Sequence, residues 1–506
     1  MKRRIFLGGS LAALSGCRRE QAIAPGHTFT LADLVDHLQT GKLTAATVLD
    51  HYLARIAALD QAGPRLRAII ELNPEARAIQ GRGPLRGVPI LIKDNIETAD
   101  AMQTTAGSLA LLGAPRPALD ATVVKRLRDA GATLLGKTNL SEWANIRSPN
   151  STSGWSARGG LTLNPHNPAH TASGSSSGSA VAVAAGLCAA AIGTETDGSI
   201  VSPASACGIV GLKPTLGLIS RAGIIPITHW QDTPGPMTRT VWDAALLLNV
   251  LAATDERDPA TASARDHIQK DYTFHLTADG LKGKRLGILR GHTGSHRRVR
   301  TLFQANVEKL RQAGAILVDD VTLPHHREAG SAAWSAMLTE FRQDLNTYLG
   351  TRGATVTTLA ELIAYNEEYR QQEMPHFNQE FFIEAETRHT PDHLAEAEKH
   401  RALAQRLAGP EGIDAALKQH RLDALICPTN DPAGLIDLGL GDAHSRIFST
   451  PAAVAGYPHL TVPMGLADDL PIGLSFIGPA WSDGLLLQLG HTFETLREYQ
   501  PTTLYS

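Results

Sequence analysis

The sequence has few cysteines and no excess of charge of either sign. Its 506 residues contain only 4 Cys, which is too few to staple a chain of this length and excludes a disulfide scaffold. Cys188, Cys207 and Cys427 lie in apolar runs, so we expect them to be core residues. Lys and Arg number 47 against 50 Asp and Glu, a formal net charge of −3. A nucleic-acid backbone requires a basic face, so we expect no nucleic-acid partner.

Long apolar runs and metal-ligand motifs are also missing. Beyond residue 16, no segment has the roughly 18 uncharged apolar residues of a membrane-spanning helix. Neither CxxC nor HExxH occurs, and His325-His326 and the pair His292 and His296 lie in charged surroundings. We expect these to be solvated loop histidines, and we expect no metal and no cofactor. Apolar residues make up 43% of the chain, enough for a full core, which excludes a disordered protein.

The N-terminus has the pattern of an export signal over residues 1–16. A positive stretch at residues 2–4 precedes a short apolar stretch at residues 5–16. The order Arg-Arg-Ile-Phe-Leu at residues 3–7 resembles a twin-arginine signal, which exports folded proteins.

Residues 14–17, Leu-Ser-Gly-Cys, resemble a bacterial lipobox, in which Cys17 would become the lipidated first residue. In the alternative, a plain secretory signal, Cys17 is incidental. Residues 17–29 then form a polar tether. The pattern predicts export to the bacterial cell envelope on the periplasmic side, with membrane contact only through a lipid on Cys17.

Helical and strand patterns alternate beyond residue 30. Helical spacing occurs at residues 31–38, 44–56, 121–130 and 180–187, and short apolar strands occur at 88–92, 133–135 and 189–192. Thr30 and Thr44 have the character of N-caps for the first two of these helices. This alternation predicts one large α/β domain over residues 30–506, whose central mixed β-sheet is covered by helices on both faces. Residues 145–173 should form a long ordered loop. Residues 330–420 should add a helical layer rather than a separate domain.

Two segments match known functional motifs in sequence but lack the secondary structure that those motifs require. Residues 131–138 match the Walker A pattern, yet the first glycine ends a helix and the apolar strand lies between the two glycines, the reverse of a phosphate-binding loop. Residues 174–178 match the G-x-S-x-G elbow, with Ser176 as its nucleophile. That elbow needs a buried strand directly before it, whereas Pro165 and Pro168 lie there instead. Both interpretations are disfavoured.

Lys93 ends the apolar run 88–92, where an ammonium ion is costly to bury. Desolvation lowers the pKa of a buried lysine, so Lys93 could remain neutral and act as a base. The alternative is a structural ion pair between Lys93 and Asp94 or another acid.

Two polar segments also have features of a catalytic site. The Ser/Gly run 173–179 precedes a helix of small residues, where backbone amides favour negative charge and hydroxyls can relay protons; a plain cap or linker is the alternative. The strand 189–192 leads into a polar turn at 193–199, whose amides could point at one oxyanion, although an ordinary β-turn remains open.

Taken together, these segments resemble the amidase signature family. The matching stretches are residues 136–139, 174–179, 193–199, 208–215, 423–429, 455–465 and 473–478. The spacing between Ser175 and Ser199 also agrees with the family. Within it, residues 137–145, 153–160 and 193–199 are similar to bacterial peptide amidases, which remove the C-terminal carboxamide of peptides.

The resemblance assigns roles to three side chains. It implies that Ser199 is the acylated nucleophile, that Ser175 is the bridging serine after a cis Gly174-Ser175 bond, and that Lys93 is the base. The backbone amides that it implies for the oxyanion are those of Thr196, Asp197, Gly198 and Ser199.

Two positions depart from the family pattern. Asp197 replaces a usual glycine, which restricts the backbone but keeps the amide. Val201 replaces a frequent arginine, and losing that cation disfavours substrates with a free carboxylate beside the amide. We therefore expect the substrate to be a small-molecule or short peptide amide, most simply an amidated peptide end. A general small-amide amidase is the alternative. The amidase subunit of a tRNA-dependent amidotransferase is a further one, against which the export signal argues. The sequence does not indicate the oligomeric state.

Overall fold

The computed structural model describes residues 23–24, 26–78, 81–442, 446–499 and 505. The predicted signal at residues 1–16, Cys17 and the first part of the tether lie outside the described residues. Within them, no helix combines the length and the apolar character needed to cross a bilayer.

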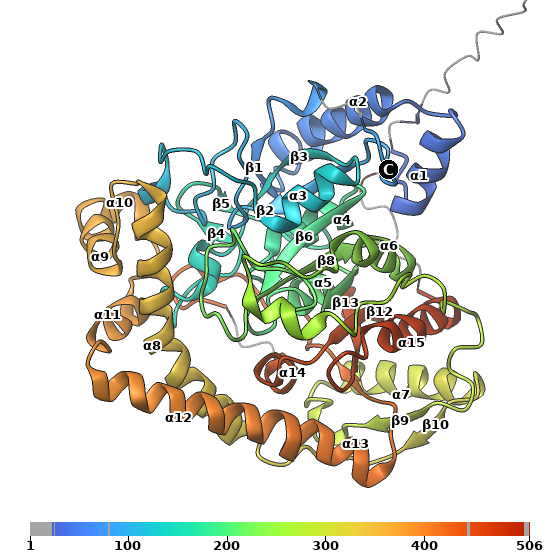
Figure 1. The fold of residues 1–506 in the computed structure, drawn as a ribbon. Coiled ribbons are helices and arrows are strands. Elements are labelled where there is room, and N and C mark those ends of the chain that lie inside the picture. Colours follow the sequence, from blue (N-terminus) through green and yellow to red (C-terminus); the bar gives the residue numbers. More distant parts are fainter. Residues whose placement is uncertain (1–22, 25, 79–80, 443–445, 500–504, 506) are drawn as a thin grey trace, which may run out of the picture.

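An eleven-stranded mixed sheet runs through the centre of the molecule (Figure 1). In spatial order its strands are β1 (Ile69–Leu72), β3 (Thr133–Thr138), β2 (Pro89–Lys93), β6 (Ala190–Glu195), β8 (Thr233–Thr238), β7 (Val210–Lys213), β12 (His459–Ala467), β13 (Leu470–Ile477), β11 (Ala424–Pro428), β9 (Arg285–Ile288) and β10 (Ile316–Val318). Strand β2 pairs in parallel with β3 and β6, and β9 pairs in parallel with β10 and β11; the remaining pairs are antiparallel.

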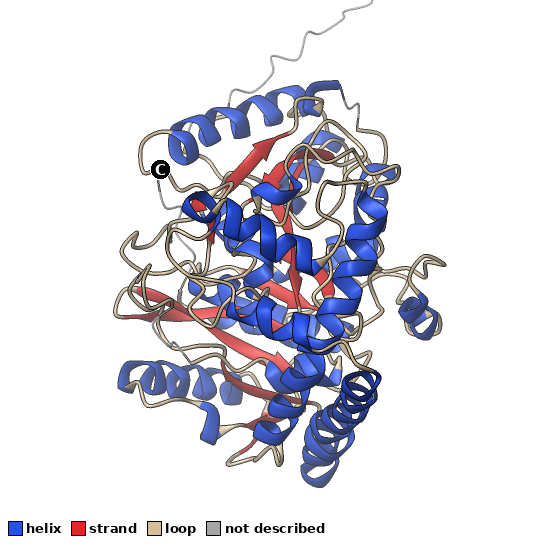
Figure 2. Cartoon of the chain, turned by 90° about the vertical axis from the view of Figure 1, so that its left-hand side faces the viewer, coloured by secondary structure: helices blue, strands red, loops and turns tan. Residues whose placement is uncertain are grey.

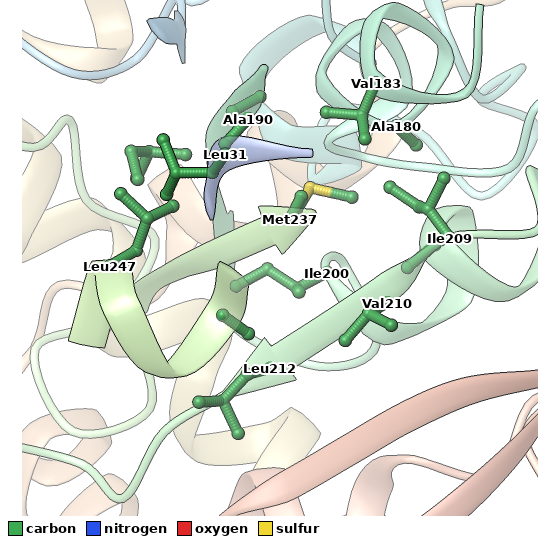
Figure 3. Close-up of a cluster of buried hydrophobic side chains, with 14 of the residues drawn as sticks. Leu31, Ala180, Val183, Ala190, Ile200, Ile209, Val210, Leu212, Met237 and Leu247 are labelled. Atoms are coloured by element: carbon green, nitrogen blue, oxygen red, sulfur yellow. The ribbon is translucent and has the colours of Figure 1, made fainter. Parts of the chain in front are cut away.

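Helices flank this sheet, so the predicted α/β fold with a central mixed sheet is confirmed (Figures 1 and 2). Those that pack against its strands include α3 (Thr122–Asp129), α4 (Ser177–Ala184), α5 (Val201–Ala206), α6 (Val241–Leu251), α7 (Arg297–Gln312) and α15 (Asp483–Leu496). Apolar side chains from these strands and helices meet in one core, in which Met237 of β8 lies among Ala180, Ile200 and Leu247 (Figure 3). Cys188, Cys207 and Cys427 are buried and free, as predicted.

The first two helices begin at the residues that the sequence predicts. Helix α1 (Leu31–Gln39) starts after Thr30, which forms a capping box with Asp33. Helix α2 (Ala45–Arg55) starts after Thr44, whose side chain accepts a hydrogen bond from the Thr47 amide.

Helices occupy most of the segment between residues 326 and 420. They are α8 (His326–Arg352), α9 (Leu359–Glu368), α10 (Arg370–Glu373), α11 (Glu380–Thr387), α12 (Pro391–Ala408) and α13 (Asp414–His420). Helices α8 and α12 pack side by side along one flank of the molecule (Figure 1). Leu338 and Phe341 of α8 share a buried cluster with Trp143 and Ile227 from outside this segment. These helices therefore share a buried apolar cluster with residues from outside the segment.

Several element boundaries differ from the prediction. Helix α4 begins at Ser177 rather than at residue 180, so the Ser/Gly run itself starts the helix. Strand β6 continues to Glu195 rather than ending at residue 192, because Gly193–Glu195 pair with β8. The expected loop 145–173 contains a small hairpin, β4 (Trp155–Ser156) and β5 (Gly160–Leu161). Strand β3 includes Gly136–Thr138, which excludes a phosphate-binding loop there.

The expectation of solvated histidines is wrong for His292 and His326. Both are half-buried, and their rings lie 4.8 Å apart between centroids. The His292 ring also lies 4.1 Å from that of Phe448. The sequence suggested solvated loops because both residues have charged neighbours along the chain, whereas their contacts come from residues distant in sequence.

Candidate active site

Lys93 lies at the end of β2 with its side chain completely buried. The parallel register of β2 and β6 pairs Ile92 with Ile192, which brings Thr194 beside the lysine. The Lys93 Nζ atom lies 2.7 Å from Ser175 Oγ, 2.9 Å from Thr194 Oγ1 and 3.2 Å from the Thr194 carbonyl oxygen. The lysine, the serine run and the end of β6 thus meet at one point.

Burial lowers the pKa of Lys93 to about 7, although the carboxylates of Asp232 and Glu195 act in the opposite direction. Near neutral pH a substantial fraction of Lys93 is therefore the free amine. A neutral amine has two N–H groups and one lone pair. The two oxygens of Thr194 can accept both N–H groups, which leaves the lone pair for the Ser175 hydroxyl.

Asp94 does not serve as a counter-ion for this lysine. Its carboxylate accepts hydrogen bonds from the Thr105 hydroxyl over 2.5 Å and from the Gly107 amide over 3.2 Å, and it lies 3.5 Å from the Arg158 guanidinium. The ion pair between Lys93 and Asp94 that the sequence left open is absent from the described part of the chain.

The serine run is fixed tightly at the start of α4. The Gly174-Ser175 peptide bond is cis, as the family resemblance implied. The Ser175 carbonyl accepts a hydrogen bond from the Ser141 amide over 3.0 Å, and the Gly178 amide donates to the Asn139 carbonyl over 3.0 Å. A side chain at Gly178 would lie 2.5 Å from that carbonyl oxygen, so only glycine permits this approach.

Ser176 has a structural environment rather than that of a nucleophile. Its side chain is completely buried, and its Oγ atom lies 3.1 Å from the Thr194 amide and 3.0 Å from the Thr194 carbonyl. Its O–H donor and one of its acceptor lone pairs are thereby used. The elbow motif with Ser176 as nucleophile is inconsistent with this geometry.

The 196–199 loop, which follows β6, is held from both ends. Glu195 Oε2 accepts hydrogen bonds from the amides of Ile200 and Val201 over 2.7 and 3.0 Å. Asp232 accepts from the Thr196 hydroxyl over 2.5 Å.

Within the described residues, the backbone N–H groups of Asp197, Gly198 and Ser199 donate to no protein acceptor. These are three of the four amides assigned to the oxyanion by resemblance, and donors of this kind stabilise such a charge.

Asp197 stands where the family usually has a glycine, and its side chain makes contacts outside the loop. Its carboxylate accepts hydrogen bonds from the Ser449 hydroxyl over 2.5 Å and the Thr450 hydroxyl over 2.7 Å, at the start of α14 (Thr450–Ala455). The next residue, Gly198, has φ of +81°, which favours glycine. The side chain of Asp197 therefore anchors the loop to α14 and leaves the backbone amide in place.

A cavity of about 330 Å³ opens onto the two serines of the site. Ser175, Thr196 and Ser199 line it, while Ser176 does not. Trp334 and Met337 of α8 complete its wall together with Ile227 and Ile447. The helical segment after residue 326 therefore shapes the pocket, which the sequence did not reveal.

The sequence did not predict a role for four residues that hold the site in place: Thr194, Glu195, Asp232 and Asn95. Thr194 and Glu195 belong to a motif assigned to a turn, and their strand geometry depends on pairing with β8. Asn95 donates to Thr194 Oγ1 over 3.0 Å. Asp232 follows no recognisable pattern and is brought in by the tertiary fold.

The fold and this site define an enzyme that hydrolyses amides. The Amidase family model matches residues 47–487, so the chain belongs to the amidase signature family and is an amidohydrolase.

Three proteins illustrate the likeness. The structure of native peptide amidase from Stenotrophomonas maltophilia is 49% identical, covers 94% of this chain and 98% of its own, and superimposes with a TM-score of 0.88. A probable amidase of Arabidopsis thaliana is 39% identical, covering 92% of this chain and 89% of its own. The crystal structure of an amidase family protein from Bacillus anthracis is 35% identical, covers 94% of this chain and 92% of its own, and superimposes with a TM-score of 0.83.

Proposed function

We propose that this amidohydrolase converts the C-terminal carboxamide of peptides to a carboxylate and ammonia by a Ser-Ser-Lys mechanism. The observation that carries the proposal is the 2.7 Å contact between the buried Lys93 amine and Ser175 Oγ, beside a cavity that also reaches Ser199.

In the acylation step, neutral Lys93 accepts the proton of Ser175 as Ser175 accepts that of Ser199. The Ser199 oxygen then attacks the carboxamide carbon, and the unoccupied amides of the 196–199 loop stabilise the oxyanion. Return of the proton along the same relay to the amide nitrogen releases ammonia and leaves the Ser199 ester.

In the deacylation step, a water molecule takes the position of the released ammonia. Its proton passes through Ser175 to Lys93 while its oxygen attacks the ester carbon. Collapse of the second tetrahedral intermediate returns the relayed proton to Ser199, which restores the resting enzyme, and releases the carboxylic acid, which loses its remaining proton to solvent as the carboxylate forms.

The charge of the cavity supports an amidated rather than a free peptide end. Among its described lining residues there is no Lys, Arg or His, while Asp197 and Asp442 are present. A carboxylate beside the scissile amide would find no cation there, and Val201 stands where many family members carry an arginine. The similarity to peptide amidase at 49% identity points to the same class of substrate.

Ammonia release from an N-acetylated dipeptide amide, from the same dipeptide with a free carboxylate and from propionamide would test the proposal. We expect the dipeptide amide to have the highest kcat/KM, with its internal peptide bond left intact. The Ser199→Ala variant, which loses only one half-buried hydroxyl, should fold normally and release no ammonia. A higher kcat/KM for propionamide would instead favour the general small-amide amidase.

A further inference from the structure

A second cavity, of about 990 Å³, adjoins the catalytic cavity. The two share Trp334 of α8 and Ile447 as lining residues, and both side chains are partly exposed. Ser449 and Thr450, whose hydroxyls hold Asp197, also line this second cavity. A peptide whose amidated end lies at Ser199 therefore has an adjoining space for its preceding residues.

The charged residues of this second cavity have one sign. Its basic side chains are His292, His326, Arg327 and Arg446, and no Asp or Glu occurs among its described lining residues. We call this cluster the basic pocket. It contrasts with the catalytic cavity, whose charged lining residues in the described chain are acidic.

Arg446 is the less exposed of the two arginines of the basic pocket. Its Nε and Nη2 atoms are buried, and no hydrogen-bond acceptor reaches them from the described residues. Asp431 lies on the same side of Gly294, but its carboxylate forms no hydrogen bond to the guanidinium and does not line the cavity. The Arg446 side chain forms no hydrogen bond or ion pair with an acid of the described chain, so its positive charge can attract a carboxylate bound in the cavity that it lines.

The ionisation of His292 independently reflects the positive field of the pocket. Burial lowers its pKa to about 4, and His326, Arg446 and Arg327 contribute in the same direction. The His292 imidazole is therefore neutral near pH 7. Its ring remains available for hydrogen bonding, while the permanent charges are those of the two arginines.

We propose that the basic pocket binds the side-chain carboxylate of an Asp or Glu that immediately precedes the amidated residue. This inference rests on the proposed function and narrows its substrate class to acidic peptide amides. One extended residue spans about 3.3–3.6 Å of backbone. The residue before the amidated end therefore lies about this far from Ser199, and a glutamate side chain adds further length. We place that side chain at the wall that the two cavities share, at Trp334 and Ile447, with its carboxylate toward the arginines.

The test compares acetyl-Glu-Leu-amide with acetyl-Gln-Leu-amide, which differ only in charge at the relevant side chain. We expect kcat/KM to favour the Glu peptide by about tenfold at low salt, as one charge-assisted hydrogen bond provides. The preference should shrink as added salt screens the charges. Arg446→Met and Arg327→Met should each reduce the ratio of the two kcat/KM values toward one. Arg116→Met, at an exposed position outside the pocket, should leave the ratio unchanged.

The outcomes separate this inference from the proposed function. If both peptides are hydrolysed at equal kcat/KM, or if the ratio survives in both variants, the basic pocket does not recognise carboxylates although the enzyme is a peptide amidase. If neither peptide amide is hydrolysed, the proposed function falls and this inference with it. Arg327 is exposed, so Arg327→Met tests the pocket even if Arg446→Met fails to fold by circular dichroism.

Discussion

The backbone N–H of Ser176 donates to the carbonyl oxygen of Ser199 over 3.2 Å. This hydrogen bond ties the serine run at the start of α4 directly to the end of the 196–199 loop. The neighbouring serines 175 and 176 therefore differ in what their hydroxyls do: Ser175 contacts Lys93, whereas Ser176 contacts the backbone of Thr194.

These contacts predict opposite effects for two matched substitutions. Ser175→Ala removes the relay between Lys93 and Ser199, so kcat should fall by about 10²–10⁴-fold with little change in stability. Ser176→Ala leaves the amide and carbonyl of Thr194 without this partner, which should lower the free energy of unfolding by about 1–3 kcal/mol while much of kcat remains. Urea unfolding and ammonia release measure both. Equal losses of kcat in the two variants would show that Ser175 is not the relay.

The lowered pKa of Lys93 predicts an acid limb in the rate profile. Protonation removes the free amine, so kcat/KM should fall as the pH decreases through about 7, the folded-state pKa of this lysine. Above that pH the amine is neutral and the rate should level off. The profile is measured by ammonia release from pH 5 to 9, with circular dichroism at each pH to separate protonation from unfolding.

Lys93→Arg tests the same role without removing the positive charge. Guanidinium remains protonated and cannot accept a proton, so this variant should be nearly inactive across the whole pH range. Substantial turnover by a correctly folded Lys93→Arg enzyme would mean that Lys93 acts only as a buried cation.

Glu195 should affect both stability and rate through the backbone that it holds. Glu195→Gln weakens charge-assisted hydrogen bonds to the amides of Ile200 and Val201, and it removes a carboxylate that supports the buried Lys213 ammonium. We expect a loss of about 1–3 kcal/mol in unfolding free energy and a lower kcat.

Glu494→Gln provides the control for Glu195→Gln. Glu494 is a mostly buried carboxyl that accepts a hydrogen bond from the Val241 amide over 3.1 Å, and it lines neither cavity. It should lose comparable stability and keep kcat. If Glu195→Gln also keeps the wild-type kcat, the loop does not depend on Glu195 for its catalytic geometry.

Export and lipidation remain a prediction from the N-terminal sequence. We propose that the protein is exported to the bacterial cell envelope and acylated at Cys17. A clickable fatty-acid probe should label the wild-type protein in the producing cells and should not label Cys17→Ala. A soluble, unlabelled protein whose N-terminus has been cleaved elsewhere would identify a plain secretory signal.

The sequence predicted those parts of the site that depend on local patterns. The short apolar run before Lys93 indicated a buried strand end, and burial of its amine follows directly. Thr30 and Thr44 marked helix starts because an N-cap hydroxyl acts within its own turn.

The remaining parts depend on contacts between distant segments. Glu195 was assigned to a turn because its strand partner, Thr233, lies on β8, and no periodicity in the sequence predicts that pairing. Ser449 and Thr450 reach Asp197 from more than 250 residues away. The half-buried state of His292 likewise depends on Phe448 and His326. Sheet order and register decide these contacts, and a single sequence encodes them only weakly.

The parallel pairing of β2 with β6 also constrains how the enzyme acquires activity during folding. Lys93 and Ser175 are 82 positions apart, and Lys93 and Thr194 are 101 positions apart. Closing such long loops costs chain entropy before the native contacts form that offset this cost, and parallel strands cannot pair through a tight hairpin. A refolding chain can therefore regain its secondary structure early, whereas recovery of turnover must wait for the central strands to align. Enzyme activity is thus a late reporter of folding in this protein, sensitive to the register of two adjacent strands.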